Sequence, residues 1–390
     1  MSEWVELKLT EVGSLQRGKS KHRPRYAFHL YNGKYPFIQT GEVRESRKYI
    51  SEFKNTYSEA GLAQSKLWPK NTLCITIAAN IAELGILKFD ACFPDSVIGF
   101  IPDKNKSNLD FVYYTLCHFQ RELKHLGEGS VQDNINLGTF NDIKFMFPSL
   151  AEQKAIASVL SSLDDKIDLL HRQNKTLESM AETLFRQWFV EEVQDDWVHG
   201  TLKDEFAFTM GQSPKGSSFN EEQIGTPMFQ GNADFGFRFP KERVYTTEPT
   251  RFAQKLDTLI SVRAPVGAQN MARSKCCIGR GVAAFRHINN PDWYTYTYFK
   301  LRCLMDEIKK FNDEGTVFGS ISKSDFEKIE VIIPPASIIH NYEIMVKPLN
   351  DRVITNCFQI EKLAKLRDTL LPKLMSGEVR VNYRPEEIKQ

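Results

Sequence analysis

The sequence predicts a mixed α/β (α+β) protein in which two tandem-duplicated globular domains are joined by two long antiparallel coiled-coil helices. Apolar residues recur at alternating steps of four and three from Ile156 to Leu184, and this spacing is typical of a coiled-coil seam. The same pattern returns 186 residues later, where Leu163 and Asp165 correspond to Leu349 and Asp351. A repeat that keeps its register in this way indicates duplication of a unit made of one globular domain and one long helix.

The repeat predicts the domain boundaries. They are a first domain at 1–150, a helix at 151–192, a second domain at 193–335, a helix at 336–378 and a tail at 379–390. In chain order, apolar runs and turn residues in the first domain predict strands at 5–9, 35–38, 72–77, 97–101 and 143–147, and a helix at 110–126. The second domain repeats this order with different loop sequences, so the framework is shared and the loops are not.

The two seams predict how the helices pair. The first seam comprises Ile156, Leu160, Leu163, Ile167, Leu170, Asn174, Leu177 and Leu184. The second comprises Val346, Leu349, Val353, Asn356, Ile360, Leu363 and Leu370, and Arg367 is its weak member. Each seam therefore carries one asparagine. We expect an antiparallel pair in which Asn174 faces Asn356, because two facing amides satisfy each other and fix the register.

Composition describes an ordinary globular protein, with 41% hydrophobic and 26% charged residues and a net charge of +2. Seven cysteines without a CxxC pair suggest a reducing cytoplasm. The longest apolar stretch, 73–87, is interrupted by Asn80 and Glu83, so no membrane-spanning segment is expected.

No catalytic motif is recognisable. The P-loop pattern GxxxxGK[ST] is missing, and Gly279-Arg280-Gly281 lacks the strand–turn–helix context of a dinucleotide site. The tetrapeptides Asn-Pro-Pro-Tyr and Asp-Pro-Pro-Tyr, expected of a DNA methyltransferase, do not occur. The histidines are not spaced as metal ligands. The sequence therefore predicts neither a catalytic centre nor a metal site.

The candidate DNA contacts are cations and amide side chains in loops. No acidic residue lies between Glu11 and Glu42, where five cations alternate with other residues from Arg17 to Arg25. Such a run fits phosphate contacts, and its alternative is a solvated surface loop. Amide side chains at loop tips can bind adenine, and their alternative is turn capping. The candidates are Arg17, Lys19, Ser20, Lys21, Arg23, Arg25, Gln39, Thr40, Gln132, Asn134, Gln212, Ser213, Lys215, Gln230, Asn232, Arg263 and Arg280.

Several motifs carry a family resemblance across the whole chain. They are Leu150-x-Glu152-Gln153-Lys154-x-Ile156-Ala157, Leu163-Asp164-x-Lys166-Ile167, Asn174-x-x-Leu177-Glu178, Leu184-Phe185-x-x-Trp188-Phe189, Gly211-Gln212-Ser213-Pro214 and Ala264-Pro265-Val266-Gly267. In these motifs and in its domain order, the chain resembles the specificity (S) subunit of Type I restriction-modification systems. One departure is Pro335-Ala336-Ser337-Ile338, which opens the second helix in place of the Glu-Gln signature.

The resemblance implies a non-catalytic, sequence-specific DNA-binding subunit with two target recognition domains, each recognising one half of an asymmetric bipartite site. It also implies helices that set the half-site spacing and dock two methyltransferase (M) subunits, with restriction/translocase (R) subunits joining through the complex. S-adenosylmethionine, ATP and magnesium are expected on those partners and no cofactor on this chain. The expected location is the cytoplasm of a bacterial or archaeal cell, in association with the nucleoid.

Physical reasoning agrees with this function. A helix of 35 residues is about 50 Å long, so domains at its ends can reach groove faces about 34 Å apart, one turn of DNA. The alternatives are a specificity module of another bipartite-site methyltransferase or nuclease assembly, a structural coiled-coil spacer, and a stand-alone enzyme. The duplication leaves no room for an enzyme domain, and a spacer does not explain two sets of unlike polar loops.

Overall fold

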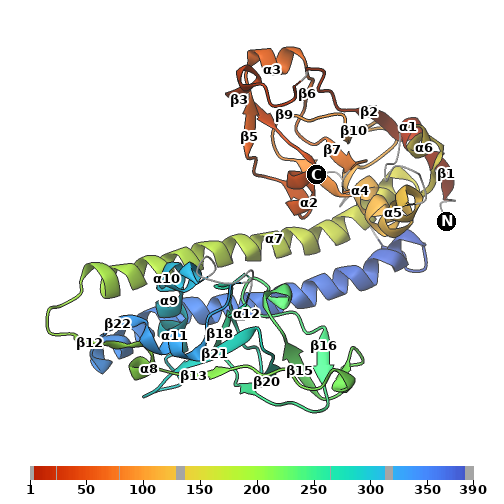
Figure 1. Ribbon diagram of the computed structural model, residues 1–390. Coiled ribbons are helices and arrows are strands. Elements are labelled where there is room, and N and C mark those ends of the chain that lie inside the picture. Colours follow the sequence, from red (N-terminus) through yellow and green to blue (C-terminus); the bar gives the residue numbers. More distant parts are fainter. Residues whose placement is uncertain are drawn as a thin grey trace. The chain divides into compact units, whose positions relative to one another are not determined.

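The computed structural model describes residues 4–22, 24–78, 80–128, 137–263, 265–311 and 319–382. The chain forms two compact units (Figure 1). Unit 1 comprises Met1–Asp168 and Glu361–Gln390, and unit 2 comprises Leu169–Ile360. Each unit therefore contains one globular domain together with part of both long helices. The unit boundaries fall inside the helices and not at their ends.

The globular part of unit 1 contains two main sheets. The first has the strand order β2 (Gly13–Arg17), β10 (Val97–Pro102), β7 (Leu73–Thr76), β8 (Leu84–Leu87) and β4 (Tyr49–Ile50). The second has the order β5 (Asn55–Tyr57), β3 (Tyr31–Phe37), β9 (Ala91–Cys92) and β6 (Leu67–Trp68). A separate ladder pairs β1 (Val5–Lys8) with β11 (Lys144–Phe147), which joins the two ends of the domain.

The helices of this domain are short. They are α1 (Leu9–Val12), α2 (Thr40–Glu45), α3 (Glu59–Ala63), α4 (Leu109–His118), α5 (Gln120–Glu128) and α6 (Leu137–Asp142). The single helix predicted at 110–126 is wrong, because Phe119 leaves helical geometry with φ −89° and ψ 5° and separates α4 from α5. The Asn108 side chain caps α4 by accepting a hydrogen bond from the Phe111 amide.

Unit 2 contains two corresponding sheets. The first has the order β13 (Phe206–Met210), β21 (Val282–His287), β18 (Thr258–Ser261) and β19 (Gln269–Met271). The second has the order β14 (Phe219–Asn220), β16 (Val244–Thr246), β15 (Thr226–Phe229), β20 (Cys276–Ile278) and β17 (Phe252–Ala253). The terminal ladder pairs β12 (Val198–Thr201) with β22 (Glu330–Ile333), and the helices are α8 (Leu202–Glu205), α9 (Tyr294–Cys303), α10 (Met305–Lys310) and α11 (Lys323–Lys328).

Sheet topology confirms the duplication. The order β2-β10-β7-β8 matches β13-β21-β18-β19, and β5-β3-β9-β6 matches β16-β15-β20-β17. In the second sheet of each unit, one pair of neighbouring strands is parallel: β3 with β9 and β15 with β20. In register, Phe37 of β3 lies opposite Cys92, and Met228 of β15 lies opposite Cys277. The interior strands β7 and β18 are buried along their whole length, so their side chains do not alternate between buried and exposed positions.

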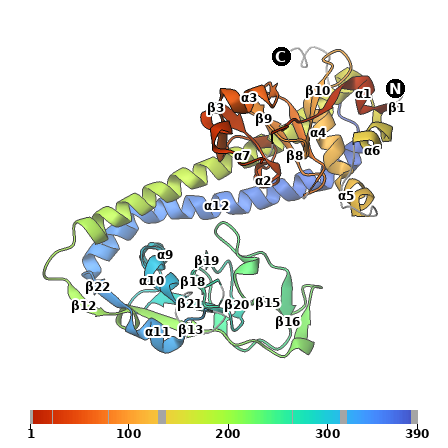
Figure 2. The ribbon, with the colours of Figure 1, turned by 45° about the horizontal axis from the view of Figure 1, so that its top comes forward.

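The long helices are α7 (Leu150–Arg186) and α12 (Ala336–Met375), and Figures 1 and 2 show them side by side. In unit 2, Asn356 Nδ2 donates to Asn174 Oδ1 at 2.8 Å, and both side chains are fully buried. The Tyr342 hydroxyl donates to the Ala181 carbonyl at 3.2 Å, so partner numbers fall along α12 as they rise along α7. The antiparallel pairing and the predicted asparagine register are confirmed.

In unit 1 the same two helices pair through charge as well as apolar packing. Arg367 Nη1 donates to Asp164 Oδ1 at 2.7 Å, and the Tyr114 hydroxyl donates to the second oxygen, Oδ2, at 2.6 Å. Asp164 is 8% exposed, so this arginine compensates a nearly buried carboxylate. Arg367 interrupts the apolar seam as expected, and the residue next to Leu163, Asp164, supplies a charged partner for it.

Candidate nucleic-acid interface

The basic run of the first domain begins where the chain leaves β2. Gly18 N donates to Val97 O at 2.8 Å and Lys19 N donates to Phe93 O at 3.0 Å. A Cβ at Gly18 would lie 2.2 Å from the Pro94 carbonyl oxygen, so this close approach requires glycine. The backbone amides of Lys21 and His22 both donate to Gln64 Oε1. The loop is therefore held by its backbone.

An acidic residue lies beside this run, although none lies within it. Arg17 Nε donates to the Asp95 carbonyl, and Arg25 Nη2 lies 3.0 Å from Asp95 Oδ1. Two of the five predicted phosphate ligands are thus engaged with one aspartate from the turn between β9 and β10. Lys21 is exposed and Lys19 half-buried, and Arg23 lies outside the described residues. We infer that the two lysines are the better candidates for phosphate contacts.

A hollow of about 460 Å³ brings four of the predicted residues together: Ser20, Arg25, Gln39 and Thr40. Three tyrosines, Tyr26, Tyr31 and Tyr57, also line it. Burial raises the pKa of Tyr31 to about 12, so its hydroxyl stays protonated and donates to the Arg25 carbonyl at 3.0 Å. Cations, amides and aromatic rings around one hollow offer phosphate contacts, base-edge contacts and stacking surfaces.

The second domain builds the corresponding loop in the same way. Gly211 N donates to Val282 O at 2.9 Å and Gln212 N donates to Ile278 O at 3.0 Å. Ser213 Oγ then donates to Gln230 Oε1 at 3.2 Å and accepts from the Arg280 amide at 3.2 Å. The structure thereby brings Gln212, Ser213, Gln230 and Arg280 into one cluster.

The remaining predicted residues have separate positions. Lys215 is exposed and precedes a 3₁₀ turn at Gly216–Ser218, and Asn232 is half-buried and begins another at Asn232–Asp234. Arg263 is exposed and forms an isolated antiparallel bridge with Ser320. Gln132 and Asn134 lie outside the described residues.

Sequence reasoning missed Asp95, Gln64 and the tyrosines of the hollow. Tyr26 directly follows the basic run and is 79% exposed, so its position in the sequence could have drawn attention to it. Gln64 and Asp95 are about 40 and 70 residues from the loop that they hold, and no local pattern marks them.

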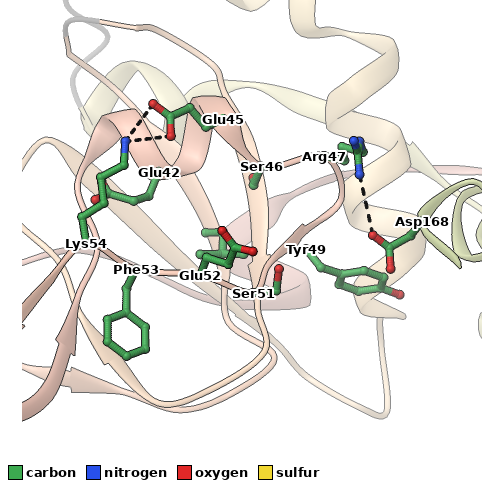
Figure 3. A pocket seen from close by; sticks show the side chains of 11 residues that line it. Glu42, Glu45, Ser46, Arg47, Tyr49, Ser51, Glu52, Phe53, Lys54 and Asp168 are labelled. Carbon is green, nitrogen blue, oxygen red and sulfur yellow. Dashed lines mark hydrogen bonds and ion pairs between the residues drawn. The ribbon is translucent and has the colours of Figure 1, made fainter. Parts of the chain in front are cut away.

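A second hollow in unit 1, of about 280 Å³, has a different charge (Figure 3). Its lining carries four carboxylates, Glu42, Glu45, Glu52 and Asp168, against two cations, Arg47 and Lys54. An excess of carboxylates repels phosphate, so this hollow is a poor DNA contact. Within the described residues, no group of three or more His, Cys, Asp and Glu side chains is arranged to hold a metal ion.

Comparison with known proteins identifies the family. The family model described as "Type I restriction modification DNA specificity domain" matches residues 1–179 and again 194–362. The chain belongs to this family. It is thus a DNA specificity subunit, the non-catalytic component of a Type I restriction-modification complex. The two matches cover the two copies of the repeat described above.

Similar proteins agree with this assignment. The specificity subunit is 32% identical to a putative type I restriction enzyme MjaX specificity subunit of Methanocaldococcus jannaschii, over 72% of this chain and 70% of that protein. It is 25% identical to the MjaIX specificity subunit of the same organism, over 97% and 94%. The crystal structure of a Type I S subunit from M. genitalium has the same fold, with a TM-score of 0.66, 19% identity and 96% of both chains covered. None of the described helices is long and apolar enough to cross a membrane.

The two lysines of the specificity subunit provide a test of the basic run. We expect the double variant Lys19→Gln/Lys21→Gln to bind all DNA sequences about 10-fold more weakly and to reduce the slope of log affinity against log salt by nearly 2, because each phosphate contact releases counterions. Titration over a salt series measures both quantities. The control is Lys70→Gln/Lys104→Gln, which removes two exposed charges from turns outside the run. If the slope of log affinity against log salt is the same in the two double variants, the basic run is a solvated surface loop and not a phosphate contact.

Proposed function

We propose that each globular domain recognises one half of an asymmetric bipartite DNA site, and that α7 and α12 set the spacing of the halves. The observation that carries this proposal is the loop that follows Gly18 and Gly211. Its backbone bonds are the same in both copies, whereas the side chains it displays differ: Lys19 in one copy, and Gln212 in the other, where the next residue, Ser213, bonds Gln230 and the Arg280 amide. One framework with two sets of side chains suits the recognition of two different half-sites.

The proposed domain division is 1–150 and 193–335 for the recognition domains, 151–192 and 336–378 for the helices, and 379–390 for the tail. In this proposal double-stranded DNA is bound by the candidate side chains of both loops. The helices dock two methyltransferase subunits, and restriction/translocase subunits join through the complex. S-adenosylmethionine, ATP and magnesium are held by those partners. This chain supplies the choice of sequence.

Exchange of one domain tests the proposal. Replacing residues 1–150 by the first domain of another specificity subunit is expected to change one half of the recognised site and to leave the other half unchanged. The methylation pattern of cells that carry the whole system identifies the site before and after the exchange. The reciprocal exchange of 193–335 is the control, and it is expected to change only the other half. If either exchange alters both halves, the domains do not recognise DNA independently.

A further inference from the structure

The edge of the first domain contacts α7 through three consecutive residues. Arg47 Nη1 lies 4.0 Å from Asp168 Oδ1, Lys48 Nζ donates to Ser161 Oγ at 2.7 Å, and the Tyr49 hydroxyl donates to Asp165 Oδ1 at 3.2 Å. On a helix, positions spaced by four and then three residues form one stripe, so this segment follows a single face of α7. Figure 3 shows the Arg47–Asp168 pair and Tyr49 beside it. We call Arg47, Lys48 and Tyr49 with their three partners the 47–49 contact.

Lys48 is the centre of this contact. Its side chain is 3% exposed, and besides Ser161 it contacts Asp110 Oδ1 of α4 at 2.8 Å. Its ammonium also lies over the rings of Tyr49, at 4.9 Å, and Tyr114, at 5.2 Å. A buried ammonium costs several kcal/mol unless its partners are well placed. The contact therefore permits little relative movement of the domain and the helix.

The contact continues into α12. The hydroxyl of Tyr114, whose ring covers Lys48, donates a hydrogen bond to Asp164. The same carboxylate accepts a hydrogen bond from Arg367 of α12. Burial raises the pKa of both Tyr49 and Tyr114, so each hydroxyl keeps the proton that it donates. Hydrogen bonds weaken steeply when their angles change, whereas the hydrophobic effect has no preferred direction. A polar network that joins β4, α4, α7 and α12 thus opposes rotation of the domain about the helix axis.

Unit 2 has an independent contact at the same position of the repeat. Asp351 corresponds to Asp165, and it accepts a hydrogen bond from the Tyr294 hydroxyl at the start of α9. Lys347 Nζ, one turn away on α12, lies 2.6 Å from the same carboxylate. Both long helices therefore present an aspartate to a tyrosine of their own globular domain, although the two tyrosines come from different elements.

We propose that Arg47, Lys48 and Tyr49 are positioning residues that fix the rotation of the first domain on α7 and thereby make the subunit strict about spacer length. This inference rests on the proposed bipartite recognition. One base pair moves a half-site by about 3.4 Å and turns it by about 34°. A domain that is locked to its helix cannot follow that turn, whereas a domain with rotational freedom can.

The experiment measures binding of the full chain to duplexes that carry both half-sites at the preferred spacing and at one base pair more or less. Lys48→Met removes the central bonds, and Arg47→Gln/Tyr49→Phe removes the two outer ones while Lys48 keeps Asp110. We expect the affinity ratio between the preferred and the altered spacings to fall at least 3-fold in both variants. Discrimination among half-site sequences is expected to stay unchanged. Glu45→Gln is the matched control, since it breaks the exposed Lys54–Glu45 pair in the same segment without touching α7.

Circular dichroism shows whether each variant folds. If Lys48→Met does not fold, the spacing ratio of Arg47→Gln/Tyr49→Phe tests the inference. An unchanged spacing ratio in a folded variant would overturn the inference, and so would altered half-site discrimination, which indicates a damaged recognition surface. The unaltered chain separates this inference from the function on which it rests. If binding by that chain does not require both half-sites, the proposed function fails. If binding does require both half-sites but the variants keep the spacing ratio of the unaltered chain, bipartite recognition stands without the positioning role.

Discussion

Replacing Asn356 by leucine is expected to destabilise unit 2 by about 2 kcal/mol, because a buried polar group would lose its partner. Among the residues that the structure describes, Asn174 would then retain the weak contact of its Nδ2 with Cys357 Sγ at 3.7 Å. Replacing both asparagines by leucine is expected to recover most of that loss, because two facing apolar side chains suit a coiled-coil seam. Denaturant unfolding of the single variants and the double variant forms a double-mutant cycle that measures the coupling.

Gln359→Leu is the control for this cycle, since residue 359 is exposed on the same helix. It is expected to change the free energy of unfolding by less than about 0.5 kcal/mol. Losses in the two single asparagine variants that simply add in the double variant would contradict an energetic role for the pair. The asparagine register would then be a consequence of the surrounding apolar contacts.

Inserting one heptad into α7 and one into α12 at facing positions is expected to lengthen the preferred gap between half-sites by about three base pairs. Seven residues add about 10.5 Å of helix, and DNA rises about 3.4 Å per base pair. Seam register is preserved, and the half-site sequences are expected to stay the same because no loop changes. Binding to duplexes with random spacers of increasing length locates the optimum.

Rotation of the duplex affects this experiment, since three added base pairs also turn the far half-site by about 100°. Affinity at the new optimum is therefore expected to be lower than that of the original pair. A heptad inserted into α12 alone is the control, and it is expected to destabilise the chain because it shifts every contact beyond it. If the optimum stays at the original gap with full affinity in the double insertion, the helices do not set the distance.

Local and periodic patterns made much of this architecture predictable. The seams persist over many turns, and each contains a single asparagine, so helix length and register follow from spacing, whereas the antiparallel orientation follows from the duplication. The shared sheet order follows from the repeat for the same reason. The hydrogen bond between Asn174 and Asn356 is the direct outcome of that reasoning.

Interactions between charges that are distant in sequence could not be predicted in this way. Arg367 interrupts an apolar pattern, and nothing near it in the sequence indicates that Asp164 would be buried opposite. Asp95 joins the basic loop from a turn about 70 residues away, and Lys48 meets Ser161 across more than 100 residues. Each of these contacts depends on how the sheets and helices pack, and the periodic pattern of apolar residues in the sequence does not encode that packing. The residues that hold the candidate loop in place, such as Asp95, were accordingly not predictable from the sequence.

The division of the chain into units has a consequence for synthesis on the ribosome. Unit 2 is one continuous segment, Leu169–Ile360, so all of its contacts become available as soon as that segment has emerged. Unit 1 is split, and its core includes Leu374 and Met375 beside Leu160 and residues of the first domain. The domain that is made first must therefore keep part of its apolar surface uncovered until the last helix arrives. Closing so long a loop is slow, and apolar surface left uncovered during that interval favours aggregation.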